Sequence, residues 1–186
     1  MTRASAFVFL LLTPAWAQVP KQVSFKAAGA PSAKTFRIAP QSFRDLERRF
    51  DGMLVGLVAD PNDPVDLVGP TRGLHLEGYG VVFTSEVSLV TTPGLSPFQK
   101  EIPKEVAERV HNRRVERLPA LKNAMKEMLH LMAMTFSVQI PPDQQMVVAI
   151  RLWYGPWENS TGMPAQILVH ATRADAQTGN VTVEEQ

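Results

Sequence analysis

The hydrophobic pattern of this chain changes its period twice, and this change limits the folds open to it. Between Arg72 and Val90, and again between Met146 and Ala171, apolar residues recur at every second position. In the segment between these two, apolar residues recur at every third or fourth position. A period of two is typical of half-buried strands, and a period near 3.6 is typical of a helix with one buried face. The pattern predicts an α+β domain with two layers, an antiparallel sheet of about four strands against two or three helices.

Two helical regions are expected. The first follows Ser42, where Asp45 stands at the spacing of a capping box, and continues to about Val58. The second covers 104–134, where Pro119 is either a kink or the first residue of a separate helix. Its apolar stripe is the clearest in the chain and is expected at the centre of the core: Leu118, Leu121, Met125, Met128, Leu129, Met132 and Phe136.

Four strands are expected as two hairpins. In the first, a two-residue type II′ turn at Gly78 and Tyr79 would place Leu74 and Leu76 on the same face as Val81 and Phe83. One long strand with a bulge at 78–80 is the alternative. The second hairpin joins 146–152 to 167–171 through a long loop. The predicted order is α-β-β-α-α-β-β, which hints at a duplication that no residue-level repeat supports.

The N-terminus reads as an export signal. Arg3 precedes a short apolar run, and Ala15-Trp16-Ala17 matches a small-x-small cleavage site. The run is much shorter than the ~20 residues that cross a bilayer. We therefore expect a cleaved signal peptide at 1–17, a flexible arm at 18–40, a single domain at 41–176 and a C-terminal tail at 177–186. The protein would be periplasmic or extracellular, without a transmembrane segment after signal removal.

Charge and motif content exclude several classes of function. The chain has 19 Lys and Arg against 18 Asp and Glu, a formal net charge of +1, which is too balanced for a nucleic-acid-binding protein. It has no Cys, no G-x-S-x-G elbow and no H-E-x-x-H helix motif. We accordingly expect neither a cofactor nor a metal site, and disulfides cannot contribute to stability.

Three residues could support acid/base chemistry. In the type II′ register Glu77 and Glu86 share the uncovered sheet face, and His75 shares it with Glu77. A periplasmic hydrolase or isomerase that uses them is the alternative function, although alternation alone produces polar residues on a solvated face. The third hypothesis is a metal chaperone with thioether ligands from Met125, Met128 and Met132, but His130 points away from their stripe.

The main hypothesis is an exported, non-enzymatic binding domain. Trp153, Tyr154 and Trp157 gather in a turn-rich loop, where aromatic rings either fold back over the core or form a recognition patch. The expected binding surface combines this loop with the open sheet face. Its residues are Tyr79, Arg151, Trp153, Tyr154, Trp157 and His170. The expected partner is another envelope or extracellular protein, or a glycan.

Overall fold

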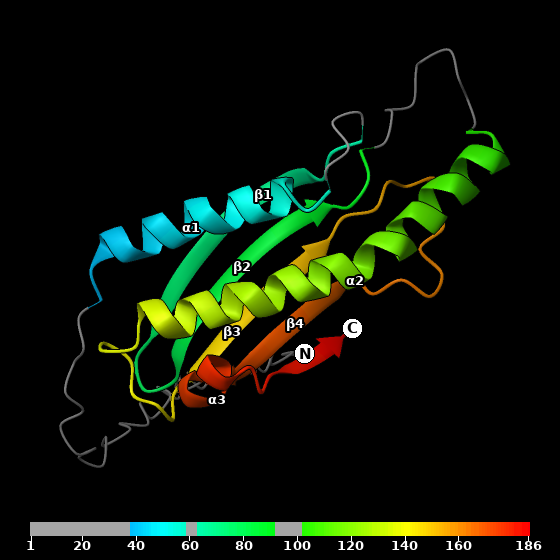
Figure 1. Cartoon of the computed structure of the whole chain (residues 1–186). Helices are drawn as coiled ribbons and strands as arrows, with labels where there is room; N and C mark the ends of the chain where they lie inside the picture. Colours follow the sequence, from blue (N-terminus) through cyan, green and yellow to red (C-terminus); the bar gives the residue numbers. More distant parts are fainter. Residues whose placement is uncertain (1–37, 59–62, 92–101) are drawn as a thin grey trace, which may run out of the picture. The chain divides into compact units, whose positions relative to one another are not determined.

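The computed structural model describes residues 38–58, 63–91 and 102–186, all within one compact unit of the chain. The predicted signal peptide and nearly all of the predicted arm lie outside the described residues. The described elements are α1 (Pro40–Val55), β1 (Asp66–Leu76), β2 (Gly80–Ser88), α2 (Lys104–Thr135), β3 (Gln145–Leu152), β4 (Gln166–Thr172), α3 (Arg173–Thr178) and β5 (Thr182–Glu185) (Figure 1). None of the described helices is long and apolar enough to cross a membrane.

The sheet has five strands in the order β1-β2-β3-β4-β5, and it is mixed. The α+β class is confirmed, but the prediction of a purely antiparallel sheet is wrong, because β2 and β3 pair in parallel. Parallel neighbours need a crossover that returns the chain to its starting end, and α2 provides it. A period of two arises in parallel and antiparallel strands alike, so the pattern could not tell them apart.

The last residues of the chain belong to the sheet. The predicted tail at 177–186 contains the end of α3 and strand β5, which pairs antiparallel with β4. Lys122 of α2 contacts Glu185 of β5 at 2.5 Å between Nζ and Oε1, and Val183 packs against the core. Thr172 caps α3, since its side chain accepts a hydrogen bond from the backbone of Asp175.

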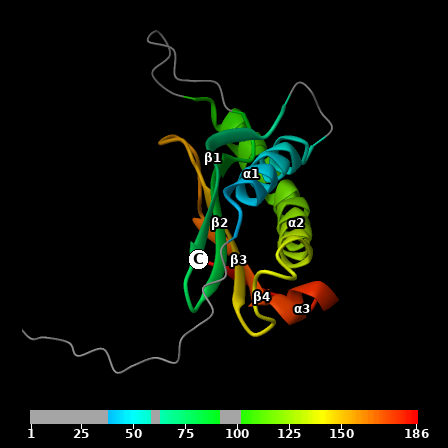
Figure 2. The same ribbon diagram turned by 90° about the vertical axis from the view of Figure 1, so that its left-hand side faces the viewer.

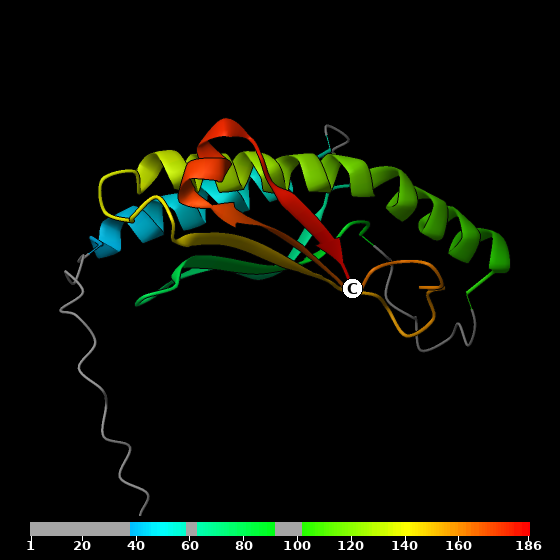
Figure 3. The same cartoon turned by 90° about the horizontal axis from the view of Figure 1, so that it is seen from below.

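The helices differ from the expectation at their ends and at Pro119. The first helix begins at Pro40, where proline suits the first helical position, and not after Ser42. The second region is one continuous helix of 32 residues with Pro119 inside it. Figure 3 shows this helix passing over the whole length of the strands and beyond them. The short α3 is the third helix, and it was not predicted.

All three helices lie on one face of the sheet, as Figure 2 shows edge-on. The core between the layers combines Leu46, Phe50 and Leu54 of α1 with the predicted stripe of α2. The inward residues of the strands complete it: Val81, Phe83, Val87, Met146, Val148, Ile150, Leu152, Ile167 and Val169. None of the described helices covers the opposite face of the sheet.

The first hairpin is offset by one residue from the predicted register. Leu76 pairs with Gly80 and Leu74 with Val82, so the connection is a three-residue loop and not a two-residue type II′ turn. Gly78 adopts a positive φ of +77°. The turn is closed by the Tyr79 amide, which donates a hydrogen bond to the Leu76 carbonyl. Gly at the third position with positive φ is what a type II turn requires. The offset moves Leu74 and Leu76 to the face opposite Val81 and Phe83.

The free edge of β1 is occupied by side chains of α1. The backbone N–H of Thr71 donates to Asp51 at 2.8 Å, and that of Gly73 donates to Glu47 at 2.9 Å. The two acids stand four residues apart, on one side of α1. An edge strand with unpaired N–H groups is a template for adding another strand, and these carboxylates occupy that position.

Candidate functional site

The uncovered face of the sheet, here called the open face, consists of rows of side chains that cross the strands. Residues directly opposite one another on paired strands point to the same side. One row contains Leu74, Val82, Val147, His170 and Thr182. The next contains Arg72, Thr84, Ala149, Leu168 and Glu184. A third contains Glu86, Arg151 and Gln166.

The open face carries an apolar strip. Leu74 and Leu76 expose 55% and 45% of their surface, an unusual amount for leucines in a strand. Val82, Ala149 and Leu168 continue the strip as half-buried residues. Contiguous exposed apolar side chains on a soluble domain mark surfaces at which other molecules bind. The sequence did not predict this strip, because a two-residue turn places both leucines on the core face.

Two of the predicted binding residues contribute charge or polarity to this face. Arg151 lies 3.9 Å from Glu86, and His170 lies 3.1 Å from Glu184. Both pairs are partly exposed to solvent, so each contributes little to stability. The open face therefore presents an aliphatic strip that begins at the β1 edge, with polar groups of both signs beside it.

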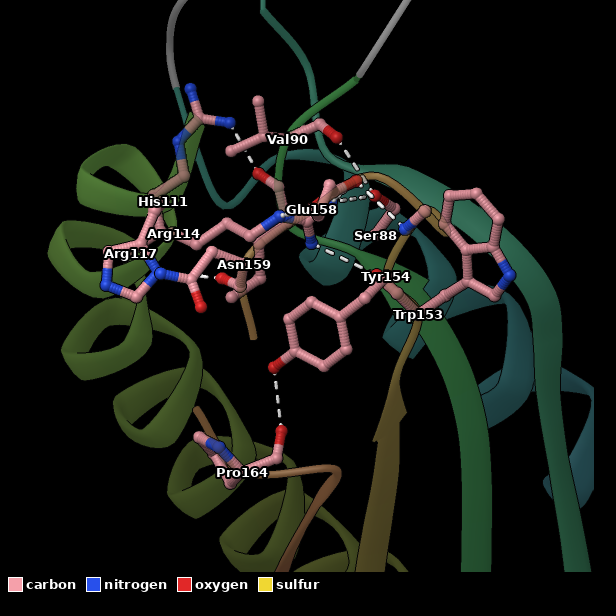
Figure 4. Close-up of polar contacts among 12 residues, drawn as sticks. Ser88, Val90, His111, Arg114, Arg117, Trp153, Tyr154, Glu158, Asn159 and Pro164 are labelled. Carbon is pink, nitrogen blue, oxygen red and sulfur yellow. Dashed lines mark hydrogen bonds and ion pairs between the residues drawn. The ribbon is translucent and has the colours of Figure 1, made fainter. Parts of the chain in front are cut away.

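The aromatic residues of the predicted loop lie in different places. Trp153 follows β3, exposes 40% of its surface and points away from α2, whereas Tyr154 points toward α2 (Figure 4). Trp157 is half-buried. Tyr79 is exposed at the tip of the first hairpin. Eight residues of β3, at about 3.3 Å each, separate the Tyr79 end of the sheet from Trp153, which is about 26 Å. Trp153 and Tyr79 therefore do not form one aromatic platform.

A buried ion pair fixes the loop that follows Trp153. Arg114 of α2 contacts Glu158 through Nε and Oε2 at 2.7 Å, and its Nη2 donates to Oε1 at 2.9 Å. The same guanidinium donates to the Trp153 carbonyl at 3.0 Å and to the Ser88 hydroxyl at 3.2 Å. Glu158 also accepts a hydrogen bond from the Gly155 amide at 3.0 Å. One arginine thus joins α2, the end of β2 and the 153–164 loop (Figure 4).

Tyr154 completes this cluster. Its ring lies 5.0 Å from the Arg114 guanidinium, a cation–π distance, and its hydroxyl donates to the Pro164 carbonyl at 2.7 Å. Burial raises the pKa of Tyr154 to about 12. The tyrosine is thus a fixed part of the loop, and only its neighbour Trp153 faces outward.

A second arginine cluster holds the chain just before β1. Arg117 donates to the carboxylate and carbonyl of Asp63 and to the Leu89 carbonyl, and Arg113 also contacts the Asp63 carboxylate at 2.8 Å. In the sequence, acidic residues are interleaved with these arginines, a pattern that is also typical of a solvated helix face. Arg114 stands four residues from both Val110 and Leu118, on the buried stripe, and that spacing was the signal of its burial.

The candidate acid/base residues do not form a site. Glu86 is on the open face, Glu77 is in the hairpin turn, and His75 pairs with the buried Val81 and therefore points to the helix-covered side. Five residues of β2, at about 3.3 Å each, separate the rows of His75 and Glu86, a distance of about 16 Å. This separation is too large for one proton-transfer site.

The methionines proposed for metal binding are core residues. Met125, Met128 and Met132 are fully buried, and His130 instead contacts the Ala176 carbonyl of α3 through Nδ1 at 3.2 Å. Among the described residues, no group of three or more His, Asp or Glu side chains could hold a metal ion.

Comparison with protein-family models, with curated proteins and with solved structures finds no match to this chain.

Proposed function

We propose that this protein is an exported, non-enzymatic binding domain that docks another protein on the open face of its sheet. The observation that carries the proposal is the exposure of Leu74 and Leu76 on a face that none of the described helices covers. Burying an aliphatic side chain of this size stabilises a complex by roughly 1.5–3 kcal/mol. Leaving two of them in water is explained by a partner that covers them.

The chemistry of the face favours a protein over a glycan. Its apolar strip is aliphatic, whereas stacking on a sugar ring uses the flat faces of aromatic side chains. The exposed Tyr79 and Trp153 lie at opposite ends of the sheet, so they cannot stack on the same sugar ring. A protein partner with its own apolar patch is complementary to this surface.

An acid/base enzyme is the weaker candidate. Glu86 is on the open face but lies against Arg151, and neither His75 nor Glu77 lies close to it in the same row. No observation on the described residues favours a reaction at this place over simple docking.

A crosslinking capture experiment from the native envelope fraction tests the proposal. The bait is the tagged protein, compared with the double variant Leu74→Ser/Leu76→Ser. The matched control is Met134→Ser/Val138→Ser, which removes two exposed apolar side chains from the end of α2 and the segment after it. We expect one protein to be captured by the parent and the control but lost with the Leu74/Leu76 variant. Equal capture by all three baits would refute the proposal.

A further inference from the structure

The charges of the open face point to a particular partner. The inference rests on the function proposed above, because it names the occupant of that same face. We propose that two copies of this chain pair through their open faces. The two-fold axis lies over β3, between the two sheets, and runs parallel to the strands. The interface would be a sandwich of two sheets.

The row that begins at Arg72 has opposite charges at its two ends. Arg72 is on β1, at one edge of the sheet, and Glu184 is on β5, at the other edge of the same row. The Arg72 side chain is largely exposed and the Glu184 side chain is half exposed. The residues between them carry no charge: Thr84, Ala149 and Leu168. One row thus has a positive end and a negative end.

A two-fold axis parallel to the strands exchanges the two edges. It places β1 of one copy opposite β5 of the other, β2 opposite β4, and β3 opposite itself. Each Arg72 then faces Glu184 of the second copy, so the same ion pair forms twice. In aligned sandwiches the two sheets lie about 10 Å apart, a gap that an arginine and a glutamate can span together.

The same operation covers the aliphatic strip from Leu74 to Leu168 and leaves Leu76 outside, because the pairing of β5 ends at Thr182, in the row of Leu74. Ala149 of β3 meets its own counterpart beside Val147, which is already buried in the single copy. Leu168 meets Thr84 of the second copy. Leu74 covers Thr182 of the second copy, at the border of the interface. Arg151 of β3 also meets its own counterpart, and Glu86, which lies 3.9 Å from Arg151 in each copy, supplies the opposite charge there. With that compensation, the paired Arg72 and Glu184 and the symmetric β3 contacts meet the requirement of an isologous interface.

Two further observations agree with a second copy as the occupant. The charged residues on the rows of the open face are Arg72 and Arg151 against Glu86 and Glu184, so that face is neutral and selects neither a strongly acidic nor a strongly basic partner. Pairing through the edge of β1 is opposed, because Asp51 and Glu47 already accept hydrogen bonds from the N–H groups of Thr71 and Gly73. Two copies are therefore more readily joined through their open faces than through their β1 edges.

The test is a charge exchange measured by sedimentation equilibrium over a wide range of protein concentration. Arg72→Glu and Glu184→Arg each convert both proposed ion pairs into like-charge contacts, and we expect each to raise the dimer Kd by about tenfold or more. The double variant restores opposite charges, and we expect its Kd to return to within about threefold of the parent. Each single variant also changes a contact within its own copy, because Arg72 lies 4.0 Å from Glu47 and Glu184 lies 3.1 Å from His170. The double variant therefore decides the test.

The matched controls are Arg49→Glu and Glu127→Arg, which reverse exposed charges on the helix-covered side. We expect no change in Kd with either, and thermal melting of every variant shows whether the fold is intact. A monomeric parent at all concentrations, or a double variant as weak as the singles, would overturn the dimer. If the monomeric protein still captures a different protein through Leu74 and Leu76, only this inference fails; if that capture is also absent, the proposed function fails as well.

Discussion

Arg114 and Glu158 form a salt bridge from which water is excluded, with side chains only 1% and 2% exposed. The pair joins the long helix to the loop that leaves β3, and it does so at the end of the sheet where Trp153 emerges (Figure 4). Such a pair contributes little net stability compared with apolar residues, but losing one partner is costly, because the other charge remains buried and unpaired.

This relationship gives the first prediction. Glu158→Ala should lower the free energy of unfolding by about 3–5 kcal/mol, because the Arg114 guanidinium loses its counter-charge inside the protein. The double variant Arg114→Met/Glu158→Leu should recover most of that loss. Urea denaturation followed by circular dichroism measures both. Arg113→Met is the control, since Arg113 is half exposed and should cost less than about 1 kcal/mol.

Tyr154 predicts a loss of stability at alkaline pH. Its pKa is about 12 in the folded protein, above the ordinary value of 10, so between these values the unfolded chain loses the proton and the folded chain keeps it. The contribution of Tyr154 is therefore complete below pH 10 and disappears as the pH rises toward 12. Denaturation midpoints between pH 9 and about pH 12 should fall more steeply for the parent than for Tyr154→Phe. Parallel curves would contradict the assigned pKa.

Gly80 predicts a severe steric defect at the parallel junction. A Cβ added there would lie 1.8 Å from the carbonyl oxygen of Gln145, and the residue has φ +142°. Since backbone would have to move, we expect Gly80→Ala to cost about 3 kcal/mol or more. Gly78→Ala is the matched control: φ is also positive, at +77°, but the space is open, and we expect about 1 kcal/mol. Similar melting temperatures for the two variants would show that the close approach is not rigid.

The carboxylates above β1 predict a local effect on hydrogen exchange. Asp51→Ala should expose the Thr71 amide and Glu47→Ala the Gly73 amide, and each exchange rate should rise at least about tenfold, since a hydrogen bond to a charged group contributes about 1.5–3 kcal/mol. Amide exchange followed by NMR resolves the two positions. Asp45→Ala, on the exposed side of α1, should change neither rate.

Much of the architecture could be predicted from the sequence, because the elements depend on the spacing of apolar residues. The helical stripe of α2 and the inward residues of β3 and β4 follow their predicted spacing, since both are fixed by which residues must leave water. The register of the first hairpin was not readable. A loop of two residues and a loop of three both fit the Gly78 region, and one residue of offset reverses the faces of Leu74 and Leu76.

Part of the candidate site could also be predicted from the spacing of residues along the strands. Arg151 and His170 fall on the open face, as their alternation in β3 and β4 implies. The role of Arg114 depends on tertiary contacts with Ser88, Trp153 and Glu158, three positions remote from it in the sequence. The composition of α2 alone, with acids and bases interleaved, gives an equally good account of a solvated surface.

The parallel pairing of β2 with β3 has a consequence for the order in which the chain folds. The hairpin β1-β2 and the pair β3-β4 are local in sequence, but residues 89–144 separate the strands that join them. Closing so long a segment is entropically slow, so we expect the two pairs to form early and the central junction to form last, after α2 has folded back. Until then the inner edges of β2 and β3 both lack a partner, and we expect this junction to be the slowest and most aggregation-sensitive step of folding.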